Sequence, residues 1–382
     1  MQTTIRFLYT LLTILCIQTL TMASHEFNPK ENAEDLNLQI KTENPEEIQA
    51  TIEKHAKTYK CRVTAKVVDP QGNTYYFGYD GRADKPIRDF SGSIDIGSCT
   101  KIFTATSVLQ LMEQGKFSLD SRLVDLLPDR EMYKNLVNFE DKDYTEEVKL
   151  YQLLNHTSGF PDYFADNDDV EFAIHGDSTL HFTPKQLIAL ADRLHDPELK
   201  PGEKFDYSNV NYILLGLIIE KYSGLPYQAY IQKHILDPLG MKDTYFSSLE
   251  SRKGRSPGFY KGKPAEMPPT MALSAGDIVS TLDDLTTFMK AWAKGSLYSD
   301  PATLEMVKTK YFDSMGMGIE YGLGIIDLQG KSFGHGGQTF GFTAYMATLR
   351  NGARFDFGCD DATASSWLPA MNISGFLSSE EK

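Results

Sequence analysis

Three stretches far apart in the sequence carry side chains that together could activate an alcohol. The first is Ser98-Cys99-Thr100-Lys101, which opens an apolar segment with helical periodicity. Residues three apart share a helix face, so the Ser98 hydroxyl and the Lys101 amine can come within hydrogen-bonding distance. A lysine whose pKa is lowered by burial can take the proton of a serine hydroxyl, which is otherwise a poor nucleophile. Because S-x-x-K alone is a weak signal, the alternative is a helix-capping serine beside a solvated lysine.

The second stretch is Tyr207-Ser208-Asn209, which lies between a Pro-Gly turn and another helical pattern. A tyrosine held near a lysine can act as a phenolate or as a proton relay, and an asparagine two residues later can orient both the lysine and a substrate amide. The alternative is a core tyrosine followed by an asparagine that caps the helix.

The third stretch, residues 333–339, is a glycine-rich strand end that contains His335, Gly337 and Gln338. Glycines in a strand let another backbone or a substrate approach closely. His335 could hydrogen-bond a substrate or an anionic group on it. A hairpin glycine cluster beside a surface histidine is the competing interpretation.

Hydrophobic periodicity predicts the elements that must position these residues. Helices are predicted over 45–55, 98–114, 148–154, 209–222, 227–236, 282–293 and 362–377, and strands over 61–68, 74–79, 322–328, 332–335, 342–350 and 354–359. The strands lie at both ends of the chain and the helices between them. This order predicts an α+β fold, an α/β sandwich: one mixed, mainly antiparallel sheet built from both chain ends, covered by helices, with a mostly helical region at about 120–310. We expect a single catalytic domain over 45–380.

The N-terminus has the pattern of an export signal. Arg6 precedes an apolar run over residues 7–22, and Ala23-Ser24 opens a polar stretch. This order predicts a signal peptide over 1–23, followed by a polar leader over 24–44. An uncleaved membrane anchor is the alternative, since the run approaches the length that spans a bilayer. We therefore expect an exported protein, periplasmic or secreted, that contacts a membrane only through an uncleaved signal.

Composition excludes several classes of protein. A formal net charge of -14 argues against a nucleic-acid partner, because phosphate binding needs a basic face. The histidines form no HxxxH or HExxH pattern and no cysteine pair has metal-ligand spacing, so we expect neither a metal nor an organic cofactor. Without Cys16 of the predicted signal, three cysteines remain, so at least one thiol should be free.

The order and spacing of the three stretches resemble those of one known family. The chain is similar to the serine β-lactamase and D-alanyl-D-alanine carboxypeptidase superfamily, on its class C side, which carries S-x-x-K, then Y-x-N, then K/H-x-G. The S-D-N and K-T-G patterns of class A enzymes are absent, which places the chain on the tyrosine branch. The stretches at 153–163, 201–224 and 236–241 also match, and the resemblance covers roughly residues 50–375.

The resemblance implies a role for each matching residue. Ser98 would attack a carbonyl carbon, with Lys101 and Tyr207 sharing the proton transfers. The backbone N–H groups of Ser98 and Gln338 would form the oxyanion hole, and Asn209 would hold the substrate amide.

At the strand end, His335 with Gly337 would bind the substrate at the position where many relatives use lysine to bind a carboxylate. Histidine there would make binding pH-sensitive near neutrality. His156 and Ser158 are expected to shape a loop rather than to react, and Cys99 to be a small core residue. The first and last strands of this fold are neighbours, so that Cys61 and Cys359 could pair.

The expected activity is that of a serine hydrolase with an acyl-enzyme on Ser98, acting on a small-molecule or peptide acyl substrate. A D-alanyl-D-alanine carboxypeptidase-like enzyme is the leading hypothesis, and a carboxylesterase or a class C β-lactamase would use the same route. A catalytically silent penicillin-binding-like protein is the alternative from another class. The complete set of serine, lysine, tyrosine and asparagine argues against it. The sequence leaves the oligomeric state open.

Overall fold

The computed structural model describes residues 45–134, 136–139, 142–164, 177–194, 199–249 and 257–378. The predicted signal peptide (1–23) and polar leader (24–44) lie outside these residues, so export stays a prediction. In the described parts of the chain, no helix is both long enough and apolar enough to cross a bilayer.

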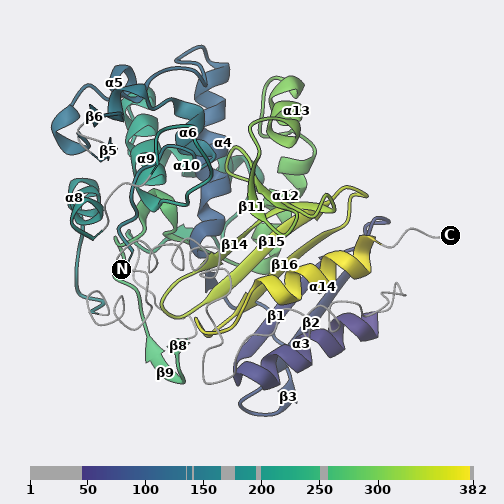
Figure 1. Cartoon of the computed structure of the whole chain (residues 1–382). Helices are drawn as coiled ribbons and strands as arrows, with labels where there is room; N and C mark the ends of the chain where they lie inside the picture. Colours follow the sequence, from purple (N-terminus) through teal and green to yellow (C-terminus); the bar gives the residue numbers. More distant parts are fainter. Residues whose placement is uncertain are drawn as a thin grey trace.

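A nine-stranded sheet built from both chain ends organises the fold, in the order β11-β12-β13-β14-β15-β16-β1-β2-β3 (Figure 1). Its strands are β1 (Arg62–Val68), β2 (Thr74–Asp80), β3 (Lys85–Pro86), β11 (Asp313–Gly316), β12 (Ile319–Tyr321), β13 (Ile326–Leu328), β14 (Ser332–Gln338), β15 (Thr343–Leu349) and β16 (Arg354–Cys359). The early strand β1 pairs with the late strand β16, with Val63 opposite Cys359. Every pairing in this sheet is antiparallel, so the predicted α+β architecture is confirmed with an antiparallel sheet rather than a mixed one.

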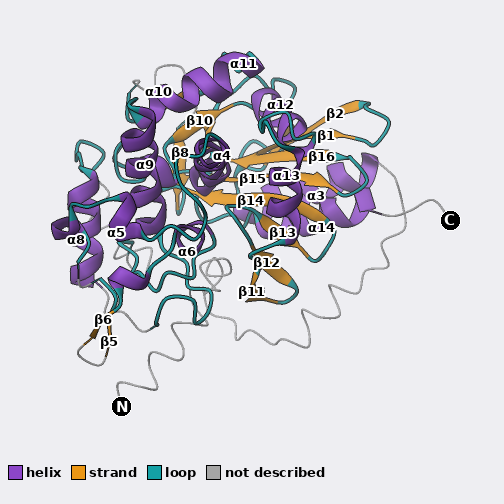
Figure 2. Ribbon diagram, turned by 90° about the horizontal axis from the view of Figure 1, so that it is seen from above, coloured by secondary structure: helices purple, strands orange, loops and turns teal. Residues whose placement is uncertain are grey.

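Helices cover both faces of this sheet. On β15, Tyr345 and Ala347 pack into the core beneath α3 (Pro45–Tyr59) and α14 (Trp367–Ser378), whereas Ala344 and Met346 face the larger core that includes α12 (Leu282–Ala293). Alternation along one strand is expected when both faces of a sheet are buried. Figure 2 shows α3 and α14 next to each other, with α12 across the strands from them.

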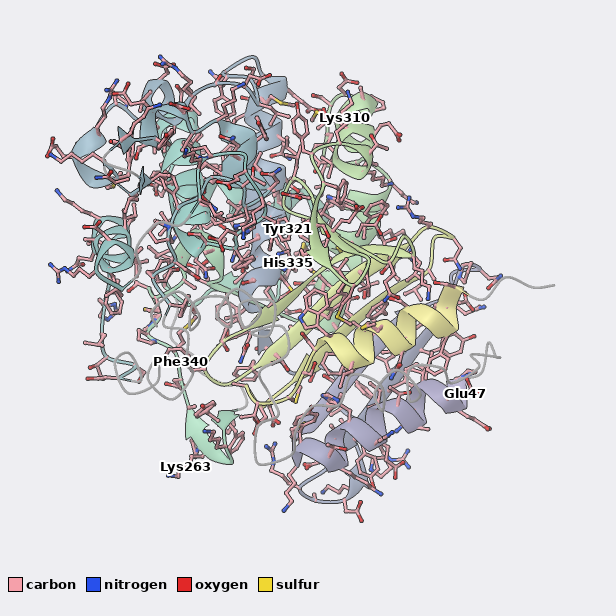
Figure 3. All side chains as sticks on the ribbon, viewed as in Figure 1. Glu47, Lys263, Lys310, Tyr321, His335 and Phe340 are labelled. Carbon is pink, nitrogen blue, oxygen red and sulfur yellow. The ribbon has the colours of Figure 1, made fainter. Side chains whose placement is uncertain are left out.

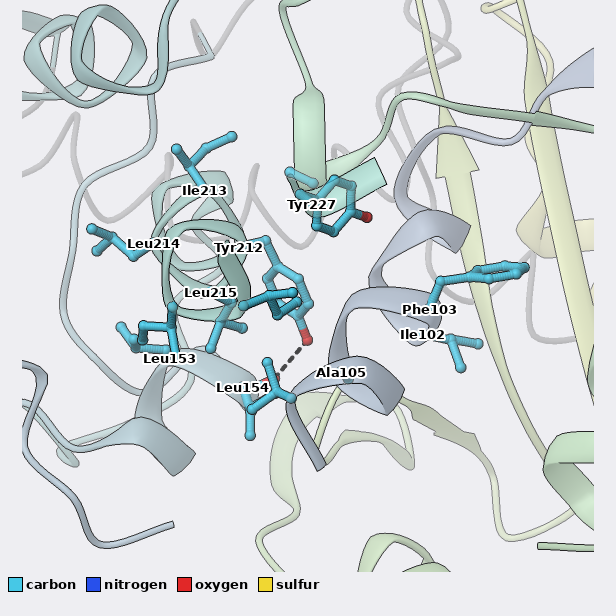
Figure 4. Close-up of a cluster of buried hydrophobic side chains, with 14 of the residues drawn as sticks. Ile102, Phe103, Ala105, Leu153, Leu154, Tyr212, Ile213, Leu214, Leu215 and Tyr227 are labelled. Carbon is cyan, nitrogen blue, oxygen red and sulfur yellow. Dashed lines mark hydrogen bonds between the residues drawn. The ribbon is translucent and has the colours of Figure 1, made fainter. Parts of the chain in front are cut away.

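The mostly helical region lies beside the sheet and is built around α4 (Thr100–Glu113) and α9 (Asn209–Ser223). Both helices are buried on nearly all sides, as is expected of a helix in the centre of a core. Figure 4 shows them facing each other, with the Tyr212 hydroxyl of α9 donating to the Leu154 carbonyl at 2.9 Å.

Shorter elements surround these two helices. The helical ones are η1 (Gly97–Cys99), α5 (Leu123–Leu126), η2 (Arg130–Met132), η3 (Thr145–Glu147), α6 (Leu150–Leu154), α8 (Pro184–Leu194), α10 (Tyr227–Ile231), η4 (Gln232–Leu236), α11 (Asp237–Leu239), η5 (Leu273–Ala275) and α13 (Pro301–Thr309). The extended ones are β4 (Ile94–Asp95), β7 (Tyr245–Phe246) and β10 (Ile278–Ser280), which form one sheet, and the hairpins β5 (Asn138–Phe139) with β6 (Lys142–Asp143) and β8 (Gly258–Tyr260) with β9 (Lys263–Ala265).

Several predicted boundaries are wrong for local reasons. The predicted strand over 322–328 is only β13, because Gly324 has a φ of +78° that interrupts an extended chain, and Ile319–Tyr321 forms a separate strand before it. The prediction ended the next strand at His335, but β14 continues through the glycines to Gln338. The closing helix starts at Trp367 rather than at 362, and α8 and α13 were not predicted.

The cysteines are buried and, among the described residues, unbridged: Cys61, Cys99 and Cys359 are all free thiols. The Cys61–Cys359 disulfide implied by the resemblance is therefore not formed, although β1 and β16 are neighbours. Cys99 is fully buried and its thiol contacts the His335 carbonyl at 3.0 Å. Burial raises the pKa of Cys99, which keeps it an unreactive thiol in the core, as expected.

Candidate active site

The structure brings the Ser98, Lys101 and Tyr207 side chains into mutual contact. Ser98 lies in η1, directly before α4, and its Oγ is 3.0 Å from Lys101 Nζ and 2.9 Å from Tyr207 Oη. Ser98 and Tyr207 are partly exposed, whereas Lys101 is fully buried. A hydroxyl that a substrate can reach therefore lies directly above a buried amine.

Three oxygen atoms surround the Lys101 amine: Ser98 Oγ, Asn209 Oδ1 at 2.7 Å and the Ala275 carbonyl oxygen at 2.9 Å. Burial lowers the pKa of Lys101 to about 7, so neutral amine is present at physiological pH. A neutral amine has two N–H groups and one lone pair. Since Asn209 Oδ1 and the Ala275 carbonyl can only accept, they take both N–H groups, and the lone pair points at Ser98. This arrangement makes Lys101 the acceptor of the serine proton.

Tyr207 is held as a neutral phenol. Removal of the ring from water raises the pKa of Tyr207 well above 10, although its hydrogen bond to Ser98 works in the opposite direction. The ring stacks on His156 at a centroid distance of 4.1 Å, and Lys101 Nζ lies 5.0 Å from the ring centroid. Of the two roles considered from the sequence, phenolate and proton relay, these surroundings favour the relay.

Asn209 contacts Lys101 from the first turn of α9, and its amide orientation is set by Asp162. The Asn209 backbone N–H donates to Asp162 Oδ1 at 3.0 Å and its Nδ2 donates to Asp162 Oδ2 at 2.9 Å. A carboxylate only accepts, so Nδ2 must face Asp162 and Oδ1 must face Lys101. Sequence reasoning did not single out Asp162; an acidic residue at the end of the matched HTSGFPD stretch was the available signal.

His335 lies in the site but its ring is committed to protein partners. Nδ1 is 2.5 Å from the Gly336 carbonyl, so it carries the proton, and Nε2 accepts from the Tyr321 hydroxyl at 2.9 Å. Figure 3 shows Tyr321 and His335 close together at the centre of the molecule. Burial lowers the pKa of His335 to about 3, so the ring stays neutral, and the expected pH sensitivity of substrate binding near neutrality is wrong. Tyr321 was also not predicted as part of the site.

The backbone nitrogens of the predicted oxyanion donors, Ser98 and Gln338, lie where β14 packs against η1. A Cβ placed on Gly97, which has a φ of +49°, would lie 2.7 Å from Gln338 N. A Cβ placed on Gly337 would lie 2.9 Å from Ser98 N and 1.9 Å from the Ile96 carbonyl. The two glycines therefore allow the backbones of η1 and β14 to approach closely at Ser98 and Gln338. The Gln338 side chain itself is directed to the Ala362 carbonyl.

We expect Gly337→Ala to lower acylation by about 10²-fold or more, the typical effect of losing one oxyanion donor. Its methyl group would collide with the Ile96 carbonyl at 1.9 Å and push β14 away from Ser98. Gly336→Ala is the matched control, because its nearest contacts are side-chain atoms at 3.3 Å, Ser366 Oγ and Tyr345 Cδ2. The rate of covalent labelling of Ser98 measures both variants, and equal rates would contradict this role for Gly337.

The loop over 154–163 packs against the start of α9, next to Asn209. His156, with a φ of +58°, accepts from the Ser208 N–H at 3.2 Å, and Ser158 Oγ donates to Asn211 Oδ1 at 2.7 Å. Both residues shape the loop, as expected from the sequence. No group of three or more His, Cys, Asp or Glu side chains in the described parts of the chain is arranged to hold a metal ion.

The sequence of the chain is similar to those of known proteins. The family model described as Beta-lactamase matches residues 48–353. The chain is 28% identical over 292 residues to a putative penicillin-binding protein, PbpX, of Bacillus subtilis strain 168, covering 73% of this chain and 68% of PbpX. It is 34% identical over 170 residues to Protein flp of Staphylococcus aureus strain MW2, covering 44% of this chain and 31% of flp. The chain thus spans only about a third of the length of flp.

The fold of the chain is also similar to solved structures of related proteins. The fold matches a D-stereospecific amidohydrolase from a Streptomyces species with a TM-score of 0.71 and 26% identity, over 85% of this chain and 98% of that one. It matches a D-amino acid amidase from Ochrobactrum anthropi SV3 with a TM-score of 0.71 and 25% identity, over 86% and 97%. An octameric penicillin-binding protein homologue from Pyrococcus abyssi matches with a TM-score of 0.72 and 26% identity, over 87% and 77%.

Proposed function

The chain belongs to the beta-lactamase family, and from this premise we propose that it cleaves an amide bond in D-configured acyl donors through an acyl-enzyme on Ser98, with D-amino acid amides preferred over D-alanyl peptides that end in a carboxylate. The observation that carries the proposal is the contact of Ser98 Oγ with two groups: a buried lysine that is partly neutral near pH 7, and a protonated tyrosine. Serine hydrolysis is the general chemistry that these groups and the family support. The D-configured substrate is the finer part of the proposal.

In the acylation step, Lys101 Nζ accepts the Ser98 proton while Oγ forms a bond to the substrate carbonyl carbon. The negative charge moves to the carbonyl oxygen, which the N–H groups of Ser98 and Gln338 stabilise. As the C–N bond breaks, the Tyr207 hydroxyl gives its proton to the leaving nitrogen, and the proton that Lys101 took from Ser98 then replaces it on the phenol oxygen. Water then hydrolyses the ester by the reverse proton transfers, releasing the acid.

Two lines of support favour an amide without a terminal carboxylate over a carboxypeptidase substrate. His335 stands where relatives bind a substrate carboxylate, but its ring is neutral and both nitrogens are hydrogen-bonded within the protein. An imidazole that is neutral, and whose two nitrogens are both hydrogen-bonded to protein groups, has neither a positive charge nor a free N–H donor for a substrate carboxylate. The names of two structural relatives, a D-stereospecific amidohydrolase and a D-amino acid amidase, point to the same class of substrate.

A panel of acyl donors tests the proposal. The purified protein is offered D- and L-phenylalanine amide, a diacyl-tripeptide ending in D-Ala-D-Ala, a chromogenic cephalosporin and p-nitrophenyl acetate, with Ser98→Ala as the blank. We expect turnover of the D-amide to exceed that of its L-enantiomer and of the carboxylate-ending peptide. Preferred hydrolysis of the cephalosporin would identify a β-lactamase, and of the ester an esterase; either result would refute the finer proposal while leaving the acyl-enzyme route intact.

The pH dependence of acylation should report the state of Lys101. Since burial lowers the pKa of Lys101 to about 7 and only the neutral amine accepts a proton, the rate should fall as the pH drops below that value, by about tenfold per unit. Tyr207 and His335 should not titrate in this range, because burial keeps both neutral. A rate that stays constant from pH 8 to pH 5 would contradict the role of Lys101.

A further inference from the structure

We infer that Asp162 is a positioning residue that acts on the reaction through Asn209 and Lys101: its carboxylate holds the Asn209 amide with Oδ1 toward the amine and adds a negative charge near that amine. The inference rests on the proposed acyl-enzyme chemistry at Ser98. Nothing in the three motifs requires this residue, which enters the site from a different loop.

The geometric basis is a two-point contact between Asp162 and one residue. Oδ1 accepts from the Asn209 backbone N–H at 3.0 Å and Oδ2 accepts from Asn209 Nδ2 at 2.9 Å, while the Tyr163 N–H donates to Oδ1 at 2.8 Å. The far end of the same amide accepts from Lys101 at 2.7 Å. The chain of contacts therefore runs from carboxylate to amide to amine to the serine oxygen.

The direction of the amide decides what the lysine can do. With Oδ1 toward the amine, Asn209 takes one N–H of neutral Lys101, and the lone pair remains available to Ser98. If the amide were reversed, Nδ2 would donate toward the amine, compete with Ser98 for the lone pair and repel the ammonium form. Only the acceptor-only chemistry of a carboxylate at position 162 excludes that orientation.

The charge of Asp162 also acts on the amine directly. Burial lowers the pKa of Lys101, and the Asp162 carboxylate is the first of the charges that oppose this effect. Burial also raises the pKa of Asp162, while its hydrogen bonds from Asn209 and Tyr163 and the charge of Lys101 favour the carboxylate form. The other groups that face the amine are Cys99, the rings of Tyr207 and Tyr212, and the imidazoles of His156 and His335. Burial keeps both imidazoles neutral and raises the pKa values of the thiol and both phenols, so these groups carry no charge at neutral pH.

A purely structural role for Asp162 is the competing explanation. Asn209 is the first residue of α9, and Ser208 before it makes no side-chain cap bond, so Asp162 also satisfies a free N–H at the helix terminus. Such a cap would contribute to stability without affecting the protonation of Lys101. The experiment must therefore measure both properties.

Asp162→Asn removes the charge with little change in shape, and it forces an amide to face the Asn209 amide. Ser208→Ala is the matched control, because Ser208 Oγ donates to the Pro161 carbonyl at 2.8 Å and so joins the same loop to the same helix without contacting Asn209 or Lys101. For both variants and the wild type, the thermal midpoint is measured, together with the pH profile of Ser98 phosphonylation by a fluorophosphonate from pH 5 to pH 9.

We expect Asp162→Asn to lower the labelling rate at pH 8 by about tenfold to a hundredfold. The acid limb, which is the part of the pH profile where the rate falls with falling pH, should move to lower pH by about one unit, since loss of a nearby opposite charge lowers a lysine pKa by 1–3 units. Ser208→Ala should lose comparable stability, but the acid limb of its pH profile should stay at the same pH as in the wild type. An unshifted limb in Asp162→Asn, with a loss of activity equal to that of Ser208→Ala, would reduce Asp162 to a helix cap and overturn the inference.

Asp162→Glu keeps the charge but breaks the two-point contact, and it carries the test if Asp162→Asn does not fold. We expect it to acylate about tenfold more slowly than the wild type, an effect in the range of a lost general-base orientation. A wild-type rate in Asp162→Glu would show that the orientation of Asn209 is not controlled by this contact. Absence of labelling in the wild type at pH 8 would instead refute the proposed function itself.

Discussion

Replacing Ser98 with alanine is expected to abolish covalent labelling by a fluorophosphonate or a penicillin and to lower turnover of the preferred substrate by about 10⁴-fold or more, as in other hydrolases that lose their nucleophile. Ser98 is the only one of the three contacting groups that combines partial exposure with a hydrogen bond to the buried amine. Intact mass after incubation with the probe measures the effect directly.

The fold should survive this change, because the Ser98 side chain makes its contacts only within the site, to Lys101 and Tyr207. Ser91→Ala serves as the control, since its hydroxyl donates to Asp89 at the exposed surface and should leave labelling unchanged. If Ser98→Ala retained the probe adduct, the nucleophile would have to be a different residue.

Lys101→Met is expected to lower acylation by about 10³-fold, within the usual contribution of a general base, and to remove the acid limb of the pH profile. Burial lowers the pKa of the Lys101 amine to about 7. Without this amine, neither Ser98 nor Tyr207 should titrate near pH 7. Measurement of the labelling rate from pH 5 to pH 9 shows both effects in one experiment.

Stability separates this result from unfolding. Methionine fills similar volume without a charge to bury, but it leaves Asn209 Oδ1 and the Ala275 carbonyl without the lysine donor, at a cost of about 1–3 kcal/mol for each acceptor left unpaired. We therefore expect a modestly lower thermal midpoint with a cooperative transition. A limb near pH 7 that persists in the folded variant would assign it to another group.

Much of the fold follows from local patterns in the sequence. The alternation in 61–68 and 354–359 and the apolar runs of 209–222 and 282–293 predict elements that the structure has within one or two residues. The antiparallel sheet from both chain ends follows from the order of these elements. Predictions failed where glycine changed the backbone, at Gly324, and where a short amphipathic helix such as α8 lay among loops.

The sequence by itself determined which groups were available: S-x-x-K puts Ser98 and Lys101 on one helix face because a helix repeats every 3.6 residues. It could not determine their proton states. Whether Lys101 is a base, Tyr207 a phenol and His335 a neutral ring depends on how much water each has lost and on partners such as Asp162 and Tyr321 that come from distant loops and strands. Desolvation and hydrogen bonding act through space, so only the tertiary structure decides them.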